Sequence, residues 1–309
     1  MAEEGRKAIR RLGIHTSTAA SLENAALHAA ELGANTFQIF SSSPRMWRAR
    51  PPNPGQIKLL KAARERFDLN PLVIHVSYLV NLASADPVIR AKSIAAFRGE
   101  LERAAAIGAE YLVLHPGSHK ERSVEEGIAD FVAALRDAAA GFQPRGLTVL
   151  LENTAGAGSH LGSRFEELAS IRERAGEVTD LPIGYCLDTC HLLAAGFDIT
   201  TPAGLRATVG AAERLLGMVN VRVFHVNDSK TPLGSRVDRH ANIGEGHIPL
   251  AAFRRILNHP KLRAKPFILE TPIDEPGDDR RNLDALKRLV RISHTARARA
   301  SVKGRKPGD

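Results

Sequence analysis

Short apolar runs alternate with longer amphipathic segments along nearly the whole chain. Eight runs are rich in Val, Ile, Leu, Phe or Tyr, and each is short enough to form a buried parallel strand. The expected strands are Arg11–Thr16, Thr36–Ser41, Leu72–Ser77, Tyr111–Pro116, Leu147–Asn153, Ile183–Thr189, Val221–Asn227 and Pro266–Thr271.

Each expected strand is followed by a segment in which apolar residues recur at helical spacing. Ser21 is suited to cap the first of these helices, while Gly33 and Gly108 are suited to end the first and the third. The expected helices are Ser21–Leu32, Gln56–Phe67, Ala91–Ile107, Val124–Ala140, Arg164–Ala175, Pro202–Leu216, Leu250–Leu257 and Leu283–Ile292.

Eight strand–helix units without an intervening linker predict an α/β fold, a single (β/α)8 TIM barrel. An open, doubly wound sheet is the alternative, but it normally has fewer units and a glycine-rich turn after its first strand. No G-x-G-x-x-G sequence follows Arg11–Thr16, which favours the barrel. We expect a flexible extension over residues 1–10, the barrel over residues 11–292 and a basic, disordered tail over residues 293–309.

The composition narrows the class of protein. With 43% hydrophobic and 25% charged residues in 309, the chain is neither disordered nor a collagen-like repeat nor a coiled coil. The formal net charge of +9 suggests an anionic partner such as nucleic acid. Residues 1–11 contribute +2 and residues 294–309 contribute +4, so the expected barrel carries only about +3. Global charge is therefore a weak indication of function.

Cysteine usage and hydropathy indicate the compartment. The two cysteines, Cys186 and Cys190, are too few for a disulfide framework, and we expect both to be buried, reduced thiols. No run of apolar residues is long enough for a signal peptide or a membrane span. The sequence thus predicts a cytoplasmic protein that does not bind membranes.

Metal-binding residue types recur near the C-terminal ends of the third to eighth strands. Their successive separations are 40, 37, 36, 37 and 45 residues, which is the period of the strand–helix unit. Because these strand ends meet on one face of a barrel, we expect the side chains to converge there. Imidazole and carboxylate ligands together suit zinc, manganese or iron. The six residues are His75, His115, Glu152, Asp188, His225 and Glu270.

Three further candidates lie close by in the sequence. His191 follows the sixth strand, and Asp238 and His240 lie two residues apart in the long loop after the seventh. Nine ligands exceed what one zinc ion uses, so two or three ions would share them if a carboxylate bridges. A single strand-end histidine is more often structural than a ligand. Six such residues in register, with four carboxylates gathered together, argue for bound cations.

His15 ends the first strand on the same face of the expected barrel. There it would either contact substrate or orient a metal ligand.

Several longer motifs carry a resemblance to a known family. They are His75-Val-Ser-Tyr-Leu-Val-Asn81, His115-Pro-Gly-Ser-His119, Glu152-Asn-Thr-Ala-Gly156, Asp188-Thr-Cys-His191, His225-Val-Asn-Asp-Ser-Lys230 and Gly234-Ser-Arg-Val-Asp-Arg-His240. Together they resemble the endonuclease IV-type AP endonucleases over roughly Gly13 to Val290. All nine ligand positions of the family pattern are matched.

The resemblance implies a site with three zinc ions. By position, one ion would be held by His75, His115 and Glu152. Glu152 would bridge to a second ion, and the ligands that complete that second site would be Asp188, His225 and Glu270. The third ion would be held by His191, Asp238 and His240.

The activity implied by the resemblance is repair of damaged DNA. Such enzymes hydrolyse the phosphodiester 5′ to an abasic site in duplex DNA, leaving a 3′-hydroxyl and a 5′-deoxyribose phosphate. Zinc suits this chemistry because it lowers the pKa of bound water to about 7 and concentrates positive charge on the phosphate. Glu152 and Glu270 are the residues to which we assign catalytic roles. Removal of 3′-blocking groups and a monomeric state are also expected.

Two loops are suited to opening the duplex at the lesion. The loop after the second strand combines Arg45 with Trp47, the single tryptophan, and the loop after the third contains Tyr78 and Leu79. Arginine contacts phosphate, and an aromatic or apolar side chain can wedge between bases. In the family, the positions of Arg45, Tyr78 and Leu79 enter the duplex. The alternative is that Trp47 packs on a neighbouring helix and the arginines are solvated.

The chain departs from the family after its first strand. The family usually has a glycine pair there, whereas this chain reads Thr16-Ser-Thr-Ala-Ala-Ser21. Because glycine-free backbone turns less freely, DNA contacts by this loop are not carried over from the family.

Two other functional classes use similar elements. A sugar isomerase or epimerase on the same barrel would need one or two metals, and it has no use for the pair Asp238 and His240 or for an Arg-Trp loop. A DNA-binding module with a structural metal is the non-enzymatic alternative, and an open, carboxylate-rich site argues against it. About three zinc ions per chain would favour the nuclease, and one manganese ion the isomerase.

Overall fold

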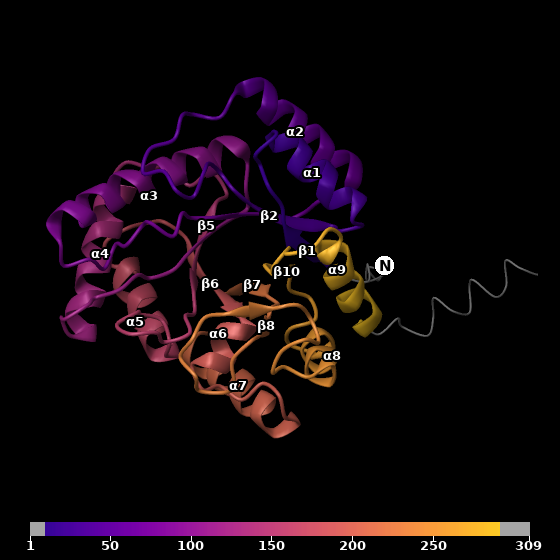
Figure 1. Ribbon diagram of the computed structural model, residues 1–309. Helices are drawn as coiled ribbons and strands as arrows, with labels where there is room; N and C mark the ends of the chain where they lie inside the picture. The colour runs from indigo at the N-terminus through magenta and orange to yellow at the C-terminus, as the bar shows by residue number, and fades with distance from the viewer. Residues whose placement is uncertain (1–9, 291–309) are drawn as a thin grey trace, which may run out of the picture.

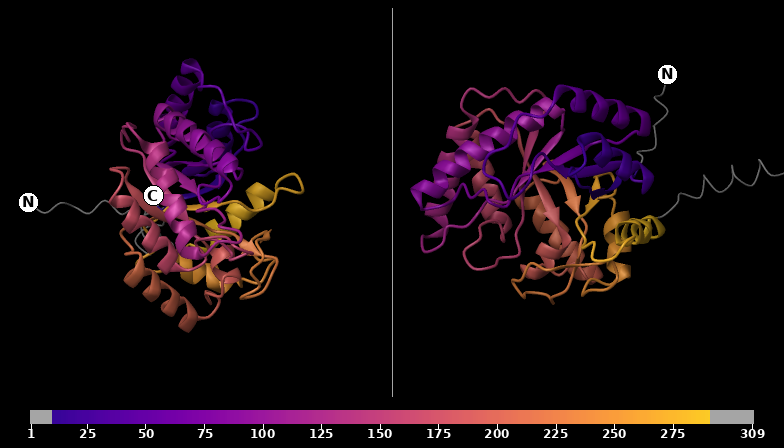
Figure 2. Two further views of the ribbon diagram at one scale, coloured as in Figure 1. Left: turned by 90° about the vertical axis from the view of Figure 1, so that its left-hand side faces the viewer. Right: turned by 45° about the horizontal axis from the view of Figure 1, so that its top comes forward.

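The structure is a computed structural model that describes residues 10–290. Within that range, eight parallel strands close into a barrel with the helices on its outside, as Figure 1 shows. The strands follow one another around the barrel in chain order, and β1 closes it by pairing with β10. Figure 2 shows the same arrangement from two further directions. The predicted TIM barrel is therefore confirmed.

Every barrel strand lies inside the segment predicted for it. The strands end one or two residues earlier than predicted, although hydrogen bonding continues past some ends, as from the Val76 N–H to the Val113 carbonyl. Their bounds are β1 Leu12–His15, β2 Thr36–Phe40, β3 Leu72–His75, β4 Tyr111–Leu114, β5 Thr148–Glu152, β6 Ile183–Asp188, β7 Val221–His225 and β10 Phe267–Leu269.

The helices agree with the predictions in position but begin earlier in several places. Helices α2 and α3 start at Pro54 and Pro87, each capped by the preceding Asn53 or Asp86 side chain. A capping residue followed by proline is a start signal that the apolar spacing alone does not reveal. The helices that correspond to predictions are α1 Leu22–Glu31, α2 Pro54–Phe67, α3 Pro87–Ile107, α4 Val124–Ala139, α5 Phe165–Gly176, α7 Pro202–Leu215, α8 Leu250–Asn258 and α9 Asp278–Leu289.

The predicted start of the last helix at Leu283 is wrong. Helix α9 begins five residues earlier, at Asp278. Apolar spacing does not predict this start because the first turn of the helix consists of charged residues. Arg291 and Ile292, at the predicted end of this helix, lie outside the described residues.

Three short elements near the ends of β6 and β7 were not predicted. Helix α6 (Thr189–Ala194) follows β6 directly. In the loop after β7, strands β8 (Asp228–Ser229) and β9 (His240–Ala241) form a two-stranded antiparallel sheet. These elements are too short to contain a recognisable hydrophobic repeat.

The predictions for the two chain ends lie outside the described residues, apart from Arg10. Within residues 10–290, no helix is both long enough and apolar enough to cross a membrane.

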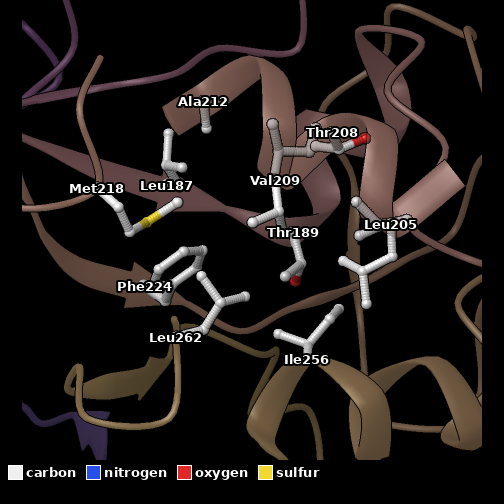
Figure 3. Close-up of a pocket in the computed structure, with 12 residues that line it drawn as sticks. Leu187, Thr189, Leu205, Thr208, Val209, Ala212, Met218, Phe224, Ile256 and Leu262 are labelled. Atoms are coloured by element: carbon white, nitrogen blue, oxygen red, sulfur yellow. The ribbon is translucent and has the colours of Figure 1, made fainter. Parts of the chain in front are cut away.

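An apolar cavity of about 20 Å³ lies between β6 and β7 and the helices α7 and α8 outside them (Figure 3). Leu187, Val209 and Phe224 point into it, and the hydroxyls of the lining residues Thr189 and Thr208 donate instead to the backbone carbonyls of Asn227 and Asp198. A cavity of this size holds at most about one water molecule, which would need several polar partners. It is therefore a packing void of the strand–helix layer, separate from the chemistry inside the barrel.

Candidate metal centre

The barrel interior explains how the strand-end residues meet. One buried residue from each of six strands fills the interior, and these residues are Val73, Val113, Leu150, Cys186, Val223 and Ile268. In every case the predicted ligand lies two positions further along the chain. Because side chains alternate with a period of two along a strand, each ligand points to the same inner face, one layer nearer the C-terminal mouth.

The first cluster consists of His75, His115 and Glu152. The Nε2 atoms of both imidazoles lie 3.0 Å from Oε2 of Glu152. The other ring nitrogen of His75, Nδ1, is 2.7 Å from the Val76 carbonyl, which orients the ring. Potential ligand atoms of the three residues all lie within 4.8 Å of one another.

The second cluster consists of Glu152, Asp188, His225 and Glu270. Nδ1 of His225 lies 2.8 Å from Oε1 of Glu152 and 3.1 Å from Oε2 of Glu270. Glu152 thus presents one oxygen to each cluster. This is the arrangement that a carboxylate bridging two cations requires.

The third cluster consists of His191, Asp238 and His240. Nε2 of His191 lies 3.1 Å from Oδ2 of Asp238, and Nε2 of His240 lies 3.5 Å from Oδ1 of the same carboxylate. His240 Nε2 is also 3.7 Å from Oδ2 of Asp188, so this cluster adjoins the second. All nine sequence-predicted ligands are thereby brought together at one end of the barrel.

Two observations test whether these residues fit metal ions. Among the described residues, Nε2 of His191 and Nε2 of His240 are buried, and although Asp238 oxygens lie 3.1 and 3.5 Å from them, no contact of either nitrogen has hydrogen-bond geometry. An imidazole nitrogen buried in this way is suited to donate its lone pair to a cation. Glu152 and Asp188 are fully buried carboxylates, and burying such charges without cations nearby is costly. Five imidazoles and four carboxylates form a donor set that suits zinc.

The ionisation of the site follows the same balance of burial and charge. Burial would raise the pKa of Glu152, but His225 and His115 outweigh it and hold that pKa well below its ordinary value. Burial would lower the pKa of His191, but Asp188 and Asp238 outweigh it and raise that pKa well above its ordinary value. The Glu152 carboxylate is therefore kept ionised by positive charge placed beside it.

Two asparagines that sequence reasoning missed hold the ligands in place. Nδ2 of Asn227 donates to Oδ2 of Asp188 at 2.5 Å, and its Oδ1 accepts from the Glu270 N–H at 2.7 Å. Oδ1 of Asn153 accepts from the Asp188 N–H at 2.7 Å. Asn153 directly follows the ligand Glu152, and Asn227 follows His225 by two residues. The sequence signal that points to these two asparagines is their position next to metal-ligand residues within the motifs.

Asp228 anchors the sheet that carries His240. Its carboxylate accepts from the backbone N–H groups of Ser229, Ile248, Gly244 and Gly246 at 2.7 to 3.0 Å. Strand β8, which contains Asp228, pairs with β9, which begins with His240.

We expect Asp228→Asn to lower the free energy of unfolding by about 3 kcal/mol, because one oxygen becomes a donor facing N–H donors. It should also weaken metal binding at the third cluster. Chemical denaturation and metal titration measure the two effects, with the exposed Asp180→Asn as control. Unchanged stability would contradict the anchoring role.

The structure places the DNA-contact candidates in two loops at the mouth. Tyr78 is 63% exposed and Arg45 is exposed, whereas Trp47 and Leu79 are half-buried. The Trp47 ring lies 6.0 Å from Nζ of Lys92 on α3. This contact agrees with the alternative in which Trp47 packs on a neighbouring helix. The Ser77 hydroxyl donates to the Pro44 carbonyl at 2.6 Å and ties the two loops together.

A groove of about 590 Å³ adjoins the metal centre, between the loops after β1 and β2. His15 lines it at the end nearest Glu270, with Nδ1 3.9 Å from Oε1 of that carboxylate. Thr16, Thr18 and Ser41 are among its other lining residues. The glycine-free loop after β1 therefore forms one wall of this groove.

Both cysteines are buried free thiols, as predicted, and burial raises the pKa of Cys186 and of Cys190 to about 12. At pH 8 a thiol with that pKa is ionised in only about one molecule in ten thousand. We therefore expect iodoacetamide to leave the native protein unmodified and to add two groups after unfolding in guanidinium, as read by mass spectrometry. Alkylation of the native protein at the rate of a free cysteine would contradict this.

Comparison with known proteins identifies the family. A family model described as "Xylose isomerase-like TIM barrel" matches residues 27–290. A "Probable endonuclease 4" of Solibacter usitatus is 75% identical over 280 residues, covering 91% of this chain and 97% of the relative. The crystal structure of endonuclease IV from Thermus thermophilus aligns with a TM-score of 0.79 and 40% identity, covering 90% and 98% of the two chains.

A D-tagatose 3-epimerase-like protein also aligns, with a TM-score of 0.64, over 94% of this chain and 99% of that protein. Its identity of 20% shows a shared fold alone. The close relatives, in contrast, are nucleases that match nearly from end to end. The chain belongs to the endonuclease IV family of AP endonucleases.

Proposed function

We propose that this protein incises duplex DNA at abasic sites, hydrolysing the phosphodiester on the 5′ side and leaving a 3′-hydroxyl and a 5′-deoxyribose phosphate. Removal of 3′-blocking groups would be a second reaction of the same site. The observation that carries the proposal is the continuous row of three ligand clusters at the barrel mouth, in which Glu152 faces two clusters and Asp188 lies beside the third. Three cations bound in these clusters would place positive charge close together, which suits a substrate that carries a phosphodiester.

The chain's own residues would hold three zinc ions in the three clusters. Bound zinc would supply positive charge for the phosphate and lower the pKa of water to about 7. Glu152, whose two oxygens face different clusters, would set the spacing between the first two ions. Glu270, whose Oε2 lies 3.1 Å from Nδ1 of His225, would be a further ligand of the second ion. These are the catalytic roles that we assign to the two glutamates.

The mouth loops would select the lesion. An abasic sugar has no base to unstack, so extruding it from the duplex costs less than extruding an intact nucleotide. The exposed Tyr78 ring and the exposed Arg45 side chain lie on loops joined through Ser77 and Pro44, so they would engage the duplex together. Selectivity would then arise from the low cost of extrusion and from wedging by these side chains.

We expect Arg45→Ala combined with Tyr78→Ala to weaken binding to an abasic duplex by about 10- to 100-fold. Losing a stacked ring costs about 1–3 kcal/mol, and losing the arginine removes a phosphate contact. Fluorescence anisotropy with an uncleavable abasic analogue measures the affinity. The control is Arg136→Ala on the outer helix α4, where the side chain pairs with Asp137. Unchanged affinity of the double variant would instead support solvated, non-contacting side chains.

Incubation with a labelled duplex that contains one abasic site tests the proposal directly. We expect one cut on the 5′ side of the site, and the new 3′ end should be extended by a DNA polymerase without further processing. The same duplex with an intact base at that position serves as the control. Incision no faster than in the intact duplex would refute the proposed function, and a 3′ end that cannot be extended would refute the proposed product.

A further inference from the structure

Gln38 lies among the proposed ligands although it belongs to none of the ligand motifs. It is on β2, between His15 of β1 and Val73 of β3 in the strand register, and its side chain is wholly buried. Burying an amide is costly unless its polar atoms are hydrogen-bonded. The partners of this amide therefore indicate what the side chain does.

The Gln38 amide uses its oxygen and its nitrogen on three residues of the mouth. Its Oε1 is 2.8 Å from Nε2 of His225, and its Nε2 is 2.5 Å from Oε1 of Glu270. The same amide nitrogen is 3.0 Å from Nδ1 of His15. Two of these partners, His225 and Glu270, belong to the second cluster.

These contacts determine the orientation of the amide and the tautomer of His225. An ionised carboxylate only accepts hydrogen bonds, so the amide nitrogen must face Glu270 and the amide oxygen must face His225. The oxygen in turn accepts, so Nε2 of His225 must carry a proton. Nδ1 of His225 is then the nitrogen left to bind a cation, and it is the one that faces Glu152 and Glu270.

We propose that Gln38 is a positioning residue that holds His225 with its proton on Nε2 and directs Glu270 toward the same point, so that the second cluster is arranged to receive a cation. This role rests on the proposed function, because it concerns the second of the three proposed zinc ions. It differs from the roles of the Asn153 and Asn227 side chains, which bind Asp188 and backbone N–H groups rather than an imidazole. Partners that orient a ligand in this way typically change metal affinity by 10- to 100-fold.

The variant Gln38→Met keeps the approximate length of the side chain and removes all three hydrogen bonds. We expect it to bind one zinc ion about 10- to 100-fold more weakly than the wild type, with the other ions unchanged. Competition between metal-depleted protein and a chelating dye measures the affinity of each ion. The matched control is Ile39→Val, at the next position of β2, where the buried side chain packs in the outer strand–helix layer. It should bind all ions as the wild type does.

A measurement on the wild type keeps the proposal testable if Gln38→Met does not fold. In zinc-loaded protein labelled with ¹⁵N-histidine, the His225 resonances should show a protonated, hydrogen-bonded Nε2 and a metal-bound Nδ1. A His225 variant assigns the resonances. A metal-bound Nε2 would overturn the proposal without reference to any Gln38 variant.

The possible outcomes distinguish a failure of the proposed function from a failure of the proposed role of Gln38. Wild-type protein that binds no zinc, or that fails to incise abasic DNA, would refute the proposed function. Wild-type protein that does both, together with Gln38→Met protein that binds every ion with unchanged affinity, would refute only the role of Gln38. Equal weakening by Gln38→Met and Ile39→Val would also refute it, since the effect would then arise from packing.

Discussion

Glu152→Gln is expected to reduce abasic-site incision by at least about a thousand-fold and to lower the amount of bound metal. Among residues 10–290, Glu152 is the one side chain that belongs to both of the first two clusters, and it presents an oxygen to each. The amide of glutamine carries no charge and offers one oxygen instead of two, so it cannot bridge two cations. Losing about 4 kcal/mol of transition-state stabilisation, which a metal can supply, corresponds to a thousand-fold loss in rate.

Single-turnover incision and elemental analysis measure the two effects of Glu152→Gln. The matched control is Glu173→Gln on α5, where the side chain is exposed on the outer surface. The control should retain full activity and metal content. An active Glu152→Gln protein with a full complement of metal would refute the bridging role and the assignment of the first two clusters.

Removal of metal by a chelator is expected to abolish incision and to lower the thermal unfolding temperature. Without the metal ions, the fully buried carboxylates of Glu152 and Asp188 lose the charge of the metals and keep only that of neighbouring imidazoles. Within residues 10–290, Nε2 of His191 and of His240 also makes no contact with hydrogen-bond geometry. An ion present at about a thousand times its dissociation constant stabilises the folded state by about 4 kcal/mol. The loss should therefore be large.

Circular dichroism during heating and the incision assay measure the effect of metal removal. Chelator that has been saturated with zinc beforehand serves as the control and should change neither property. Adding zinc back should restore both. Incision that continues after complete metal removal would refute the catalytic role of the clusters, and an unchanged unfolding temperature would show that the site is stable without cations.

Periodicity in the sequence determined most of the fold. Each barrel strand lies within its predicted segment because a buried parallel strand is a short, continuous apolar run. Periodicity does not reveal an element that is too short to show a repeat or that consists of charged residues. The charged first turn of α9 and the short elements α6, β8 and β9 are such cases. Proline after a capping residue would have located the starts of α2 and α3.

The sequence also determined that the strand-end ligands would converge. Each lies two positions beyond an interior residue such as Val73 or Ile268, and the period of a strand then directs all of them to one face. Local alternation directs each ligand to the inner face of its strand, and the predicted barrel brings the strand ends together.

The family resemblance implied which ligands would hold the same ion, but only the tertiary structure showed which side chains orient those ligands. Gln38 and Glu270 are 232 residues apart in the chain, and they meet because β1 pairs with both β2 and β10 when the barrel closes. Asp228 likewise reaches Gly244 and Ile248 only after the loop behind β7 has folded back. A neutral Gln inside an apolar strand has no sequence signature of its own. Its role depends on which side chains closure brings within hydrogen-bonding distance, and no local pattern encodes that distance.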